Sequence, residues 1–151
     1  MGIETDIHQA TFKTVKQKAM INLLYSYGWV IEQIKTFVAN EDITHQQYNI
    51  LRILRGSAPK PLSTLQIRER MLDKMSDTSR IVDRLVTKEL VKKCTCVSDK
   101  RLVDVTISEK GQLLLAKLDA DSDHIDKVMN NLTEEEAEQL SNLLDKLRKS
   151  D

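Results

Sequence analysis

The fold of this chain is decided by residues 76–85, which read SDTSRIVDRL. The apolar members of this stretch, Ile81, Val82 and Leu85, recur at helical spacing and therefore share one face. We predict a short helix capped by Ser76, and its opposite face is polar and basic, with Ser76, Ser79, Arg80, Asp83, Arg84 and Thr87. Hydroxyl and arginine side chains on one helix face suit the major groove of DNA, although an ordinary solvated face gives the same pattern.

The segments on either side of this helix complete the pattern of a winged helix-turn-helix. Residues 63–66, Ser-Thr-Leu-Gln, form a capping box, which predicts a preceding helix that runs to about Leu72. Residues 91–97 and 102–107 alternate in polarity and are rich in β-branched side chains, so they predict a hairpin. The polar turn 98–101 between these strands, Ser-Asp-Lys-Arg, is then the tip of the wing.

Further helices are predicted on both sides of the winged helix-turn-helix. Apolar residues recur in steps of three and four from Phe12 to Val38, which predicts a helix of ~40 Å. Such length exceeds the internal needs of a 151-residue chain, so its apolar stripe is expected to meet a second copy. Further capping residues predict helices that start at Thr44 and Ser108 and run to about Arg55 and Asn130, and a last helix after Thr133 with an apolar stripe over 137–147.

We therefore expect one mainly α domain over 1–151, with a small β-hairpin. Residues 12–40 and 109–149 would supply intertwined dimerisation helices, and 44–108 would form the DNA-binding lobe. Gly111 falls in the first turn of a predicted helix, where glycine is a poor helix former. Another stretch of backbone is therefore expected to lie close to it.

The charge distribution is compatible with a nucleic-acid partner. The net charge is zero, but residues 56–110 hold 12 Lys and Arg against 8 Asp and Glu, a surplus of 12 − 8 = +4. Electrostatic footprints are local, so a basic middle can bind DNA beside an acidic C-terminal part. No apolar run approaches the ~18 residues of a membrane span, and the N-terminus lacks a signal-peptide pattern, so a cytoplasmic protein is expected.

The sequence gives no indication of an enzyme, a cofactor or a metal site. His8, His45 and His124 are scattered, and the chain has neither a nucleophile–base spacing nor a glycine-rich phosphate loop. Cys94 and Cys96 lie two apart on a predicted strand and so share a face, with no further ligands to complete a zinc site. We predict buried structural thiols; a thiol-based redox response is the alternative.

The resemblance to a family lies in residues 99–111, DKRLVDVTISEKG. This stretch resembles the signature of the MarR (multiple antibiotic resistance regulator) family: Asp-x-Arg, a strand, then Thr/Ser-x-x-Gly at the start of a helix. Residues 79–85 are similar to the recognition helix of the family, and 88–91 to the segment that leaves it. The resemblance implies a homodimer whose two winged helices face successive major grooves of a pseudo-palindromic operator. Its expected function is transcriptional regulation, usually repression released by a small molecule or a stress signal.

The resemblance also implies roles for particular residues. Arg101 would enter the minor groove from the wing, with its guanidinium held by Asp99, although a surface salt bridge explains that pair equally. A small, often phenolic ligand would lie between the dimer helices and the lobe, near Tyr25, Trp29 and Tyr48, which core packing also explains. The expected DNA-binding residues are Ser76, Thr78, Ser79, Arg80, Arg84, Asp99, Lys100 and Arg101.

One departure from the family pattern concerns the end of the recognition helix, where Glu89 stands in place of the usual Gly. If this residue is left-handed, it costs ~1–2 kcal/mol, and its charge also opposes the helix dipole. The alternative function is a winged helix that binds proteins and not DNA, which the neutral net charge favours.

Overall fold

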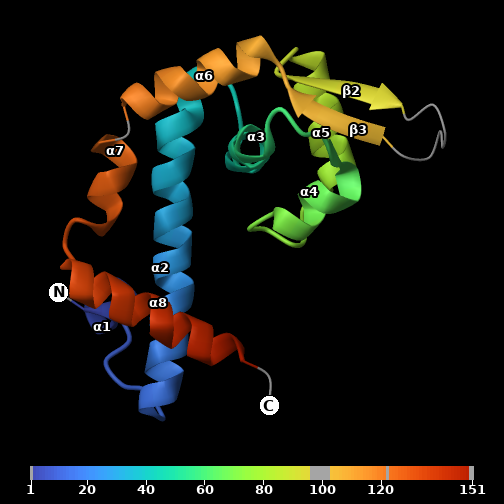
Figure 1. Cartoon of the computed structure of the whole chain (residues 1–151). Helices are drawn as coiled ribbons and strands as arrows, with labels where there is room; N and C mark the ends of the chain where they lie inside the picture. The colour runs from blue at the N-terminus through green and yellow to red at the C-terminus, as the bar shows by residue number, and fades with distance from the viewer. Residues whose placement is uncertain (1, 96–102, 122, 150–151) are drawn as a thin grey trace.

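The computed structural model describes residues 2–95, 103–121 and 123–149. Its described part is mainly helical with one small sheet (Figure 1). In chain order the elements are α1 (Ile3–Asp6), α2 (Val15–Val38), the 3-10 helix η1 (Ala39–Glu41), α3 (His45–Ser57), β1 (Leu62–Ser63), α4 (Thr64–Arg70), α5 (Thr78–Thr87), β2 (Val91–Thr95), β3 (Val103–Ile107), α6 (Glu109–Ala120), α7 (Asp123–Asp126), the 3-10 helix η2 (Lys127–Met129) and α8 (Glu134–Arg148). The predicted class, mainly α with a β-hairpin, is confirmed.

Side-chain caps set the start of most of these helices. The hydroxyls of Thr44, Ser63 and Thr133 each accept the backbone N–H three residues on, and the Gln or Glu at that position reaches back, so all three predicted capping boxes are present. Ser108 caps α6 as predicted. The first long helix begins later than predicted, because the Thr14 hydroxyl accepts the N–H of Gln17 and fixes its start at Val15.

The sheet has three antiparallel strands in the order β1-β3-β2. The hairpin pairs Val91 with Ile107 and Thr95 with Val103, which confirms the predicted strands within the described residues. The third strand, β1, was missed because it has only two residues; its Leu62 pairs with Val105. In this order β2 is an edge strand.

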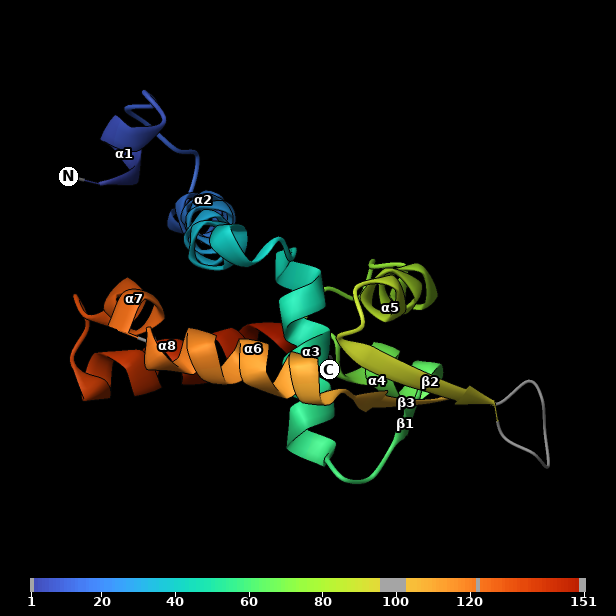
Figure 2. The same cartoon turned by 90° about the horizontal axis from the view of Figure 1, so that it is seen from above.

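The hydrophobic core lies inside the lobe formed by α3, α4, α5, the sheet and α6. Figure 2 shows α3 between α6 and the winged part of the chain. The side chains that are almost fully buried come from every one of these elements, and they include Leu51, Leu54, Leu62, Ile67, Val82, Leu85, Val105 and Leu115. The face of α5 that was predicted to pack does so through Val82 and Leu85, while Ile81 is half-buried.

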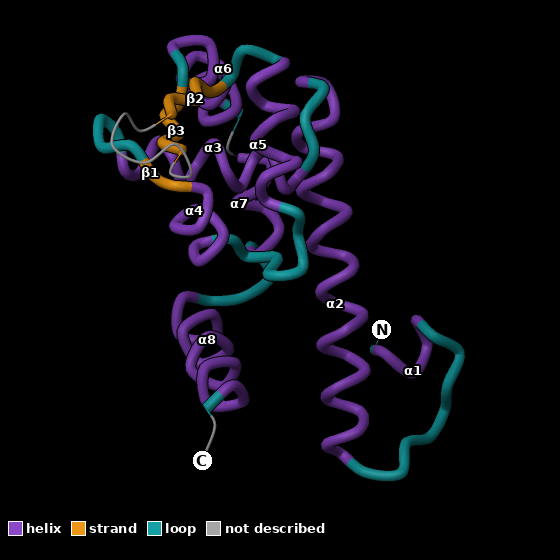
Figure 3. The backbone as a smooth tube through the Cα atoms, turned by 90° about the vertical axis from the view of Figure 1, so that its right-hand side faces the viewer, coloured by secondary structure: helices purple, strands orange, loops and turns teal. Residues whose placement is uncertain are grey.

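The two long helices outside the lobe leave their apolar stripes uncovered in a single chain. In Figures 2 and 3, α8 lies apart from α2. Only Phe37 and Val38 of α2 are buried, and α8 has no buried residue. On α2, Val15 is 84% exposed and Tyr27 59%, and on α8, Leu143 is 58% exposed.

The predicted helix from Glu109 to Asn130 is wrong in its second half. The structure ends α6 at Ala120, and only the short α7 and η2 follow before α8. The stretch 119–126, DADSDHID, combines closely spaced like charges with Asp and Ser, whose side chains compete for backbone groups. Both effects disfavour a continuous helix there.

Among the described helices, none combines the length and the apolar character that a membrane crossing requires.

Candidate nucleic-acid interface

The exposed face of α5 carries the side chains that the sequence assigned to it. Ser79, Arg80, Asp83, Arg84 and Thr87 are all exposed, opposite the buried Val82 and Leu85 (the packing face). Within the described part of the chain, the guanidinium groups of Arg80 and Arg84 have no hydrogen-bond or ion-pair partner. The guanidinium donors of Arg80 and Arg84 are therefore available on the exposed face of α5.

The start of α5 differs by one residue from the prediction. Asp77 is the cap, because its carboxylate Oδ1 accepts the backbone N–H of Arg80 at 3.2 Å. The predicted cap, Ser76, lies outside the helix, and within the described ranges its hydroxyl has no hydrogen-bond partner. Asp and Ser are both favoured cap residues, so their adjacency left the position open in the sequence.

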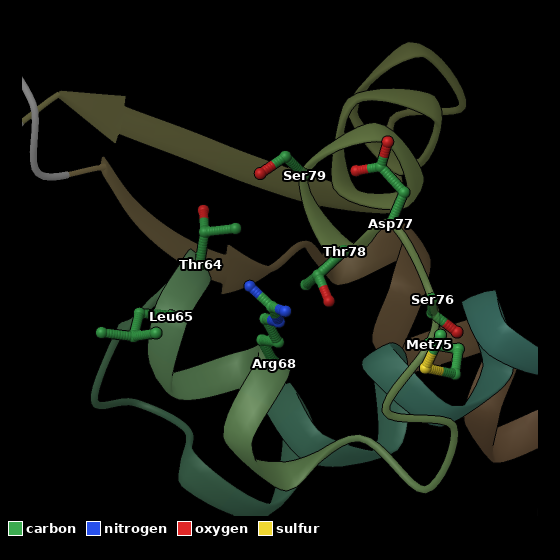
Figure 4. A pocket seen from close by; sticks show the side chains of 8 residues that line it. All are labelled: Thr64, Leu65, Arg68, Met75, Ser76, Asp77, Thr78 and Ser79. Atoms are coloured by element: carbon green, nitrogen blue, oxygen red, sulfur yellow. The ribbon is translucent and has the colours of Figure 1, made fainter.

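A hollow of about 500 Å³ lies between the start of α4 and the start of α5 (Figure 4). Its lining includes Thr64 and Arg68 from α4, and Thr78 and Ser79 from α5. In Figure 4 the side chains of Arg68 and Thr78 reach into the space between the two helices. The carboxylate of Asp77, engaged at the first turn of α5, is the one acid in this lining.

Thr78 is the unusual member of this lining. It is only 4% exposed, yet its hydroxyl Oγ1 has no hydrogen-bond partner among the residues that the structure describes. A buried hydroxyl without a partner costs ~1–3 kcal/mol. The Oγ1 atom is covered by the protein, whereas Arg68 and the first turn of α5 bring positive charge to the hollow, and this makes an anion a suitable ligand there.

An ion pair connects β2 of the wing to α5. Lys93 on β2 places its Nζ 2.8 Å from Oδ1 of Asp83, on the exposed face of α5. The predicted tip residues, Asp99, Lys100 and Arg101, lie outside the described residues.

The exit of α5 is fixed by backbone contacts on both sides. Glu89 is left-handed, with φ of 62°, as its place in the family pattern suggested, and its carbonyl accepts the Ser108 hydroxyl at 2.7 Å. Gly111 lies against this exit: a Cβ there would meet Ile107 Cγ1 at 2.8 Å and the carbonyl oxygen of Leu90 at still closer range. The predicted close approach of another backbone to Gly111 is confirmed.

The three aromatic residues predicted near a ligand differ in their surroundings. Tyr48 is a core residue, with its ring edge-on to Phe37 at 6.0 Å between centroids and the Arg52 guanidinium over it at 5.7 Å. Tyr25 and Trp29 lie on α2 and are about half exposed. None of the three lines the hollow between α4 and α5.

The prediction of buried structural thiols is wrong for Cys94, which is exposed on β2. On this edge strand only Val91 is buried, and the next four residues face solvent on both sides of the strand. Cys96 lies outside the described residues. In the described ranges, no group of three or more His, Cys, Asp or Glu side chains is placed to hold a metal ion.

Two residues of the hollow, Thr64 and Arg68, were missed by the sequence reasoning. Both belong to α4, the first helix of the helix-turn-helix, and their spacing of four residues places them on one helix face. That spacing was the available signal, but it has a meaning only once α4 is known to lie beside the start of α5.

Comparisons with known proteins agree with this geometry. Residues 43–103 match the model of the MarR family. The chain is 27% identical over 128 residues to the HTH-type transcriptional regulator MhqR of Bacillus subtilis (strain 168), covering 84% of this chain and 87% of that one.

Two solved structures show the same fold. A mutant of MarR from E. coli, complexed with operator DNA, superposes with a TM-score of 0.75 at 20% identity and covers 99% of this chain and 100% of that one. BpsR of Bordetella bronchiseptica, whose DNA binding is regulated by 6-hydroxynicotinic acid, gives a TM-score of 0.71 at 19% identity and covers 84% and 96%.

Proposed function

We propose that the chain is a member of the MarR family and acts as a homodimeric, sequence-specific repressor that a small molecule releases from DNA. The observation that carries the proposal is the exposed face of α5, where Arg80 and Arg84 are held without partners on a helix packed firmly by its other side. Arginine pairs in a bidentate manner with the major-groove edge of guanine, so this face is suited to reading bases.

The hollow between α4 and α5 would hold the DNA backbone while α5 reads the bases. A phosphate there would meet the charge of Arg68, close to the free amides of the first turn of α5. Such backbone contacts fix the register of a protein on the duplex without carrying sequence information. The wing would add Arg101 in the minor groove, held by Asp99.

Dimerisation would use the stripes that α2 and α8 leave uncovered. An isolated 15-residue helix such as α8 is marginal in water, so a helix without buried residues needs a partner. In a twofold dimer the two α5 helices would face half-sites about 34 Å apart, one turn of the duplex, and the operator would be pseudo-palindromic.

The ligand that releases the protein from DNA would bind at the surface between α2 and the lobe. Tyr25 and Trp29 on α2 are half exposed in one chain, which leaves aromatic surface for a small aromatic ligand or for the second copy. Control of DNA binding by such a compound is what is described for BpsR, a protein of the same fold.

A salt titration of binding to random duplex tests the DNA-binding part of this proposal. Each neutralised phosphate releases counterions, so log K should fall linearly and steeply with log[salt]. Fragments selected from genomic DNA then supply the operator and the regulated genes. A weak, salt-independent association with duplex would favour a winged helix that binds proteins.

One observation favours a second candidate, a redox-responsive regulator. Cys94 is exposed on β2, a strand that also carries Lys93 and its link to Asp83 on α5. Under this candidate, peroxide would release the operator from the wild type but not from Cys94→Ser or Cys96→Ser. Equal release, or equal resistance, in all three proteins would remove it.

A further inference from the structure

Three segments that are distant in sequence meet at the side chain of Lys88, the C-cap residue that follows α5. Its ammonium donates to the backbone carbonyl of Asp42 and, at 3.3 Å, to Oε1 of Gln47. Asp42 lies in the corner that joins α2 to α3, and Gln47 lies in the first turn of α3. One cation therefore links the end of the candidate recognition helix to the end of the candidate dimerisation helix.

Both acceptors are held in place by the fold. Asp42 is left-handed, with φ of 53°, and ends η1. Gln47 is 3% exposed, and the same Oε1 accepts the N–H of Thr44 at 3.0 Å as part of the capping box. The carboxylate of Asp42 is fully exposed and 3.8 Å away, so the ion pair itself contributes little. The link is therefore made by the charge-assisted hydrogen bonds to the carbonyl and the amide.

The same region is also fastened to α6. The Nζ of Lys117 lies 2.7 Å from Oε1 of Glu41 in the α2–α3 corner, and the Glu41 side chain is only 14% exposed. At the exit of α5, the carbonyl of Lys88 accepts the Nζ of Lys110 at 3.0 Å. The corner and the exit are thus tied to one another directly through Lys88, and indirectly through α6.

We propose that Lys88 is a positioning residue that couples the orientation of α5 to the orientation of α2. In the dimer it would thereby set the separation of the two recognition helices. The inference rests on the proposed function. Hydrophobic packing between α3 and its neighbours is non-directional, whereas hydrogen bonds from one donor to two fixed acceptors define an angle. Removing the ammonium should leave the core intact, including the packing of Val82 and Leu85, while the C-terminal end of α5 loses the contact that fixes its angle to α2.

The test uses the full-length protein and its selected operator. Lys88→Met keeps the aliphatic stem and removes the cation, and binding is measured to the operator and to versions with the half-sites moved one base pair closer or farther. The wild type should prefer the native spacing, and we expect this preference to fall about three- to tenfold in Lys88→Met, which is within the range for loss of one coupling residue. Affinity for a single half-site should stay within about twofold, and Lys88→Arg should restore the preference.

Lys92→Met is the matched control, because Lys92 is an exposed lysine of β2 and its loss removes the same charge from the same lobe. It should leave the spacing preference unchanged. Should Lys88→Met fail to fold by thermal melting, Lys88→Gln replaces it in the same assay.

Two results would overturn the role of Lys88 alone: an unchanged spacing preference in Lys88→Met, or an equal loss on single half-sites and full operators, which would make Lys88 a DNA contact. A wild-type protein that binds no duplex would instead overturn the proposed function, and this inference with it.

Discussion

Replacement of Gly111 by Ala tests the packing that holds the exit of the candidate recognition helix. In an ordinary helix interior this change stabilises by ~1 kcal/mol. Here the added Cβ would lie 2.8 Å from Ile107 Cγ1 and closer still to the carbonyl oxygen of Leu90, which also accepts the N–H of Ser108 at 3.0 Å. Overpacking of this kind costs ~1–3 kcal/mol, and loss of the hydrogen bond adds ~1 kcal/mol. The net expectation is a loss of ~1–3 kcal/mol.

The assay is denaturant unfolding at a fixed protein concentration, since a dimer is expected. Gly56→Ala is the matched control: a Cβ at Gly56, in the last turns of α3, meets nothing within 4 Å. It should be neutral or stabilise by up to ~1 kcal/mol. A Gly111→Ala protein as stable as its Gly56→Ala counterpart would refute the argument that backbone contact at Leu90 requires a glycine.

The remaining predictions concern the dimer, the hollow and the wing. Leu143→Asp should abolish the dimer in sedimentation, because it places a charge on the uncovered stripe of α8, while Asn142→Asp on the opposite face should not. Thr78→Val should leave the melting temperature equal or higher, since an unpaired buried hydroxyl is removed; a lower melting temperature would show that the hydroxyl has a partner in the folded protein. Arg101→Ala should have the melting temperature of the wild type but lose ~1–3 kcal/mol of operator binding, with a shallower dependence of affinity on salt. An Arg101→Ala protein that binds the operator with wild-type affinity would remove the wing from the mechanism.

The parts of the fold that were predictable are those governed by local rules. Capping boxes at Thr44, Ser63 and Thr133 mark helix starts, because a hydroxyl and a Gln or Glu three residues later satisfy free amides within one turn. The polar face of α5 follows from helical periodicity, and the tight contact at Gly111 follows from the cost of glycine in a first turn.

The parts that were not predictable depend on tertiary neighbours. The hollow forms only because α4 lies beside the start of α5, so the sequence did not indicate Arg68. Alternation suggested a buried Cys94, but the place of β2 at the edge of the sheet exposes it. The end of α6 at Ala120 was not predicted, because apolar residues continue through Ile125 at helical spacing, although the Asp-rich composition opposes the helix.

The most direct test of the central claim, that the exposed face of α5 reads DNA bases, is selection of bound sequences by the wild type and by Arg80→Ala. The account predicts that the wild type enriches a pseudo-palindrome with half-sites about one helical turn apart. Arg80→Ala should keep the palindrome and its spacing but lose the base preference at one symmetric position in each half-site. Enrichment of no common sequence by the wild type, or an unaltered preference at every position in Arg80→Ala, would contradict it.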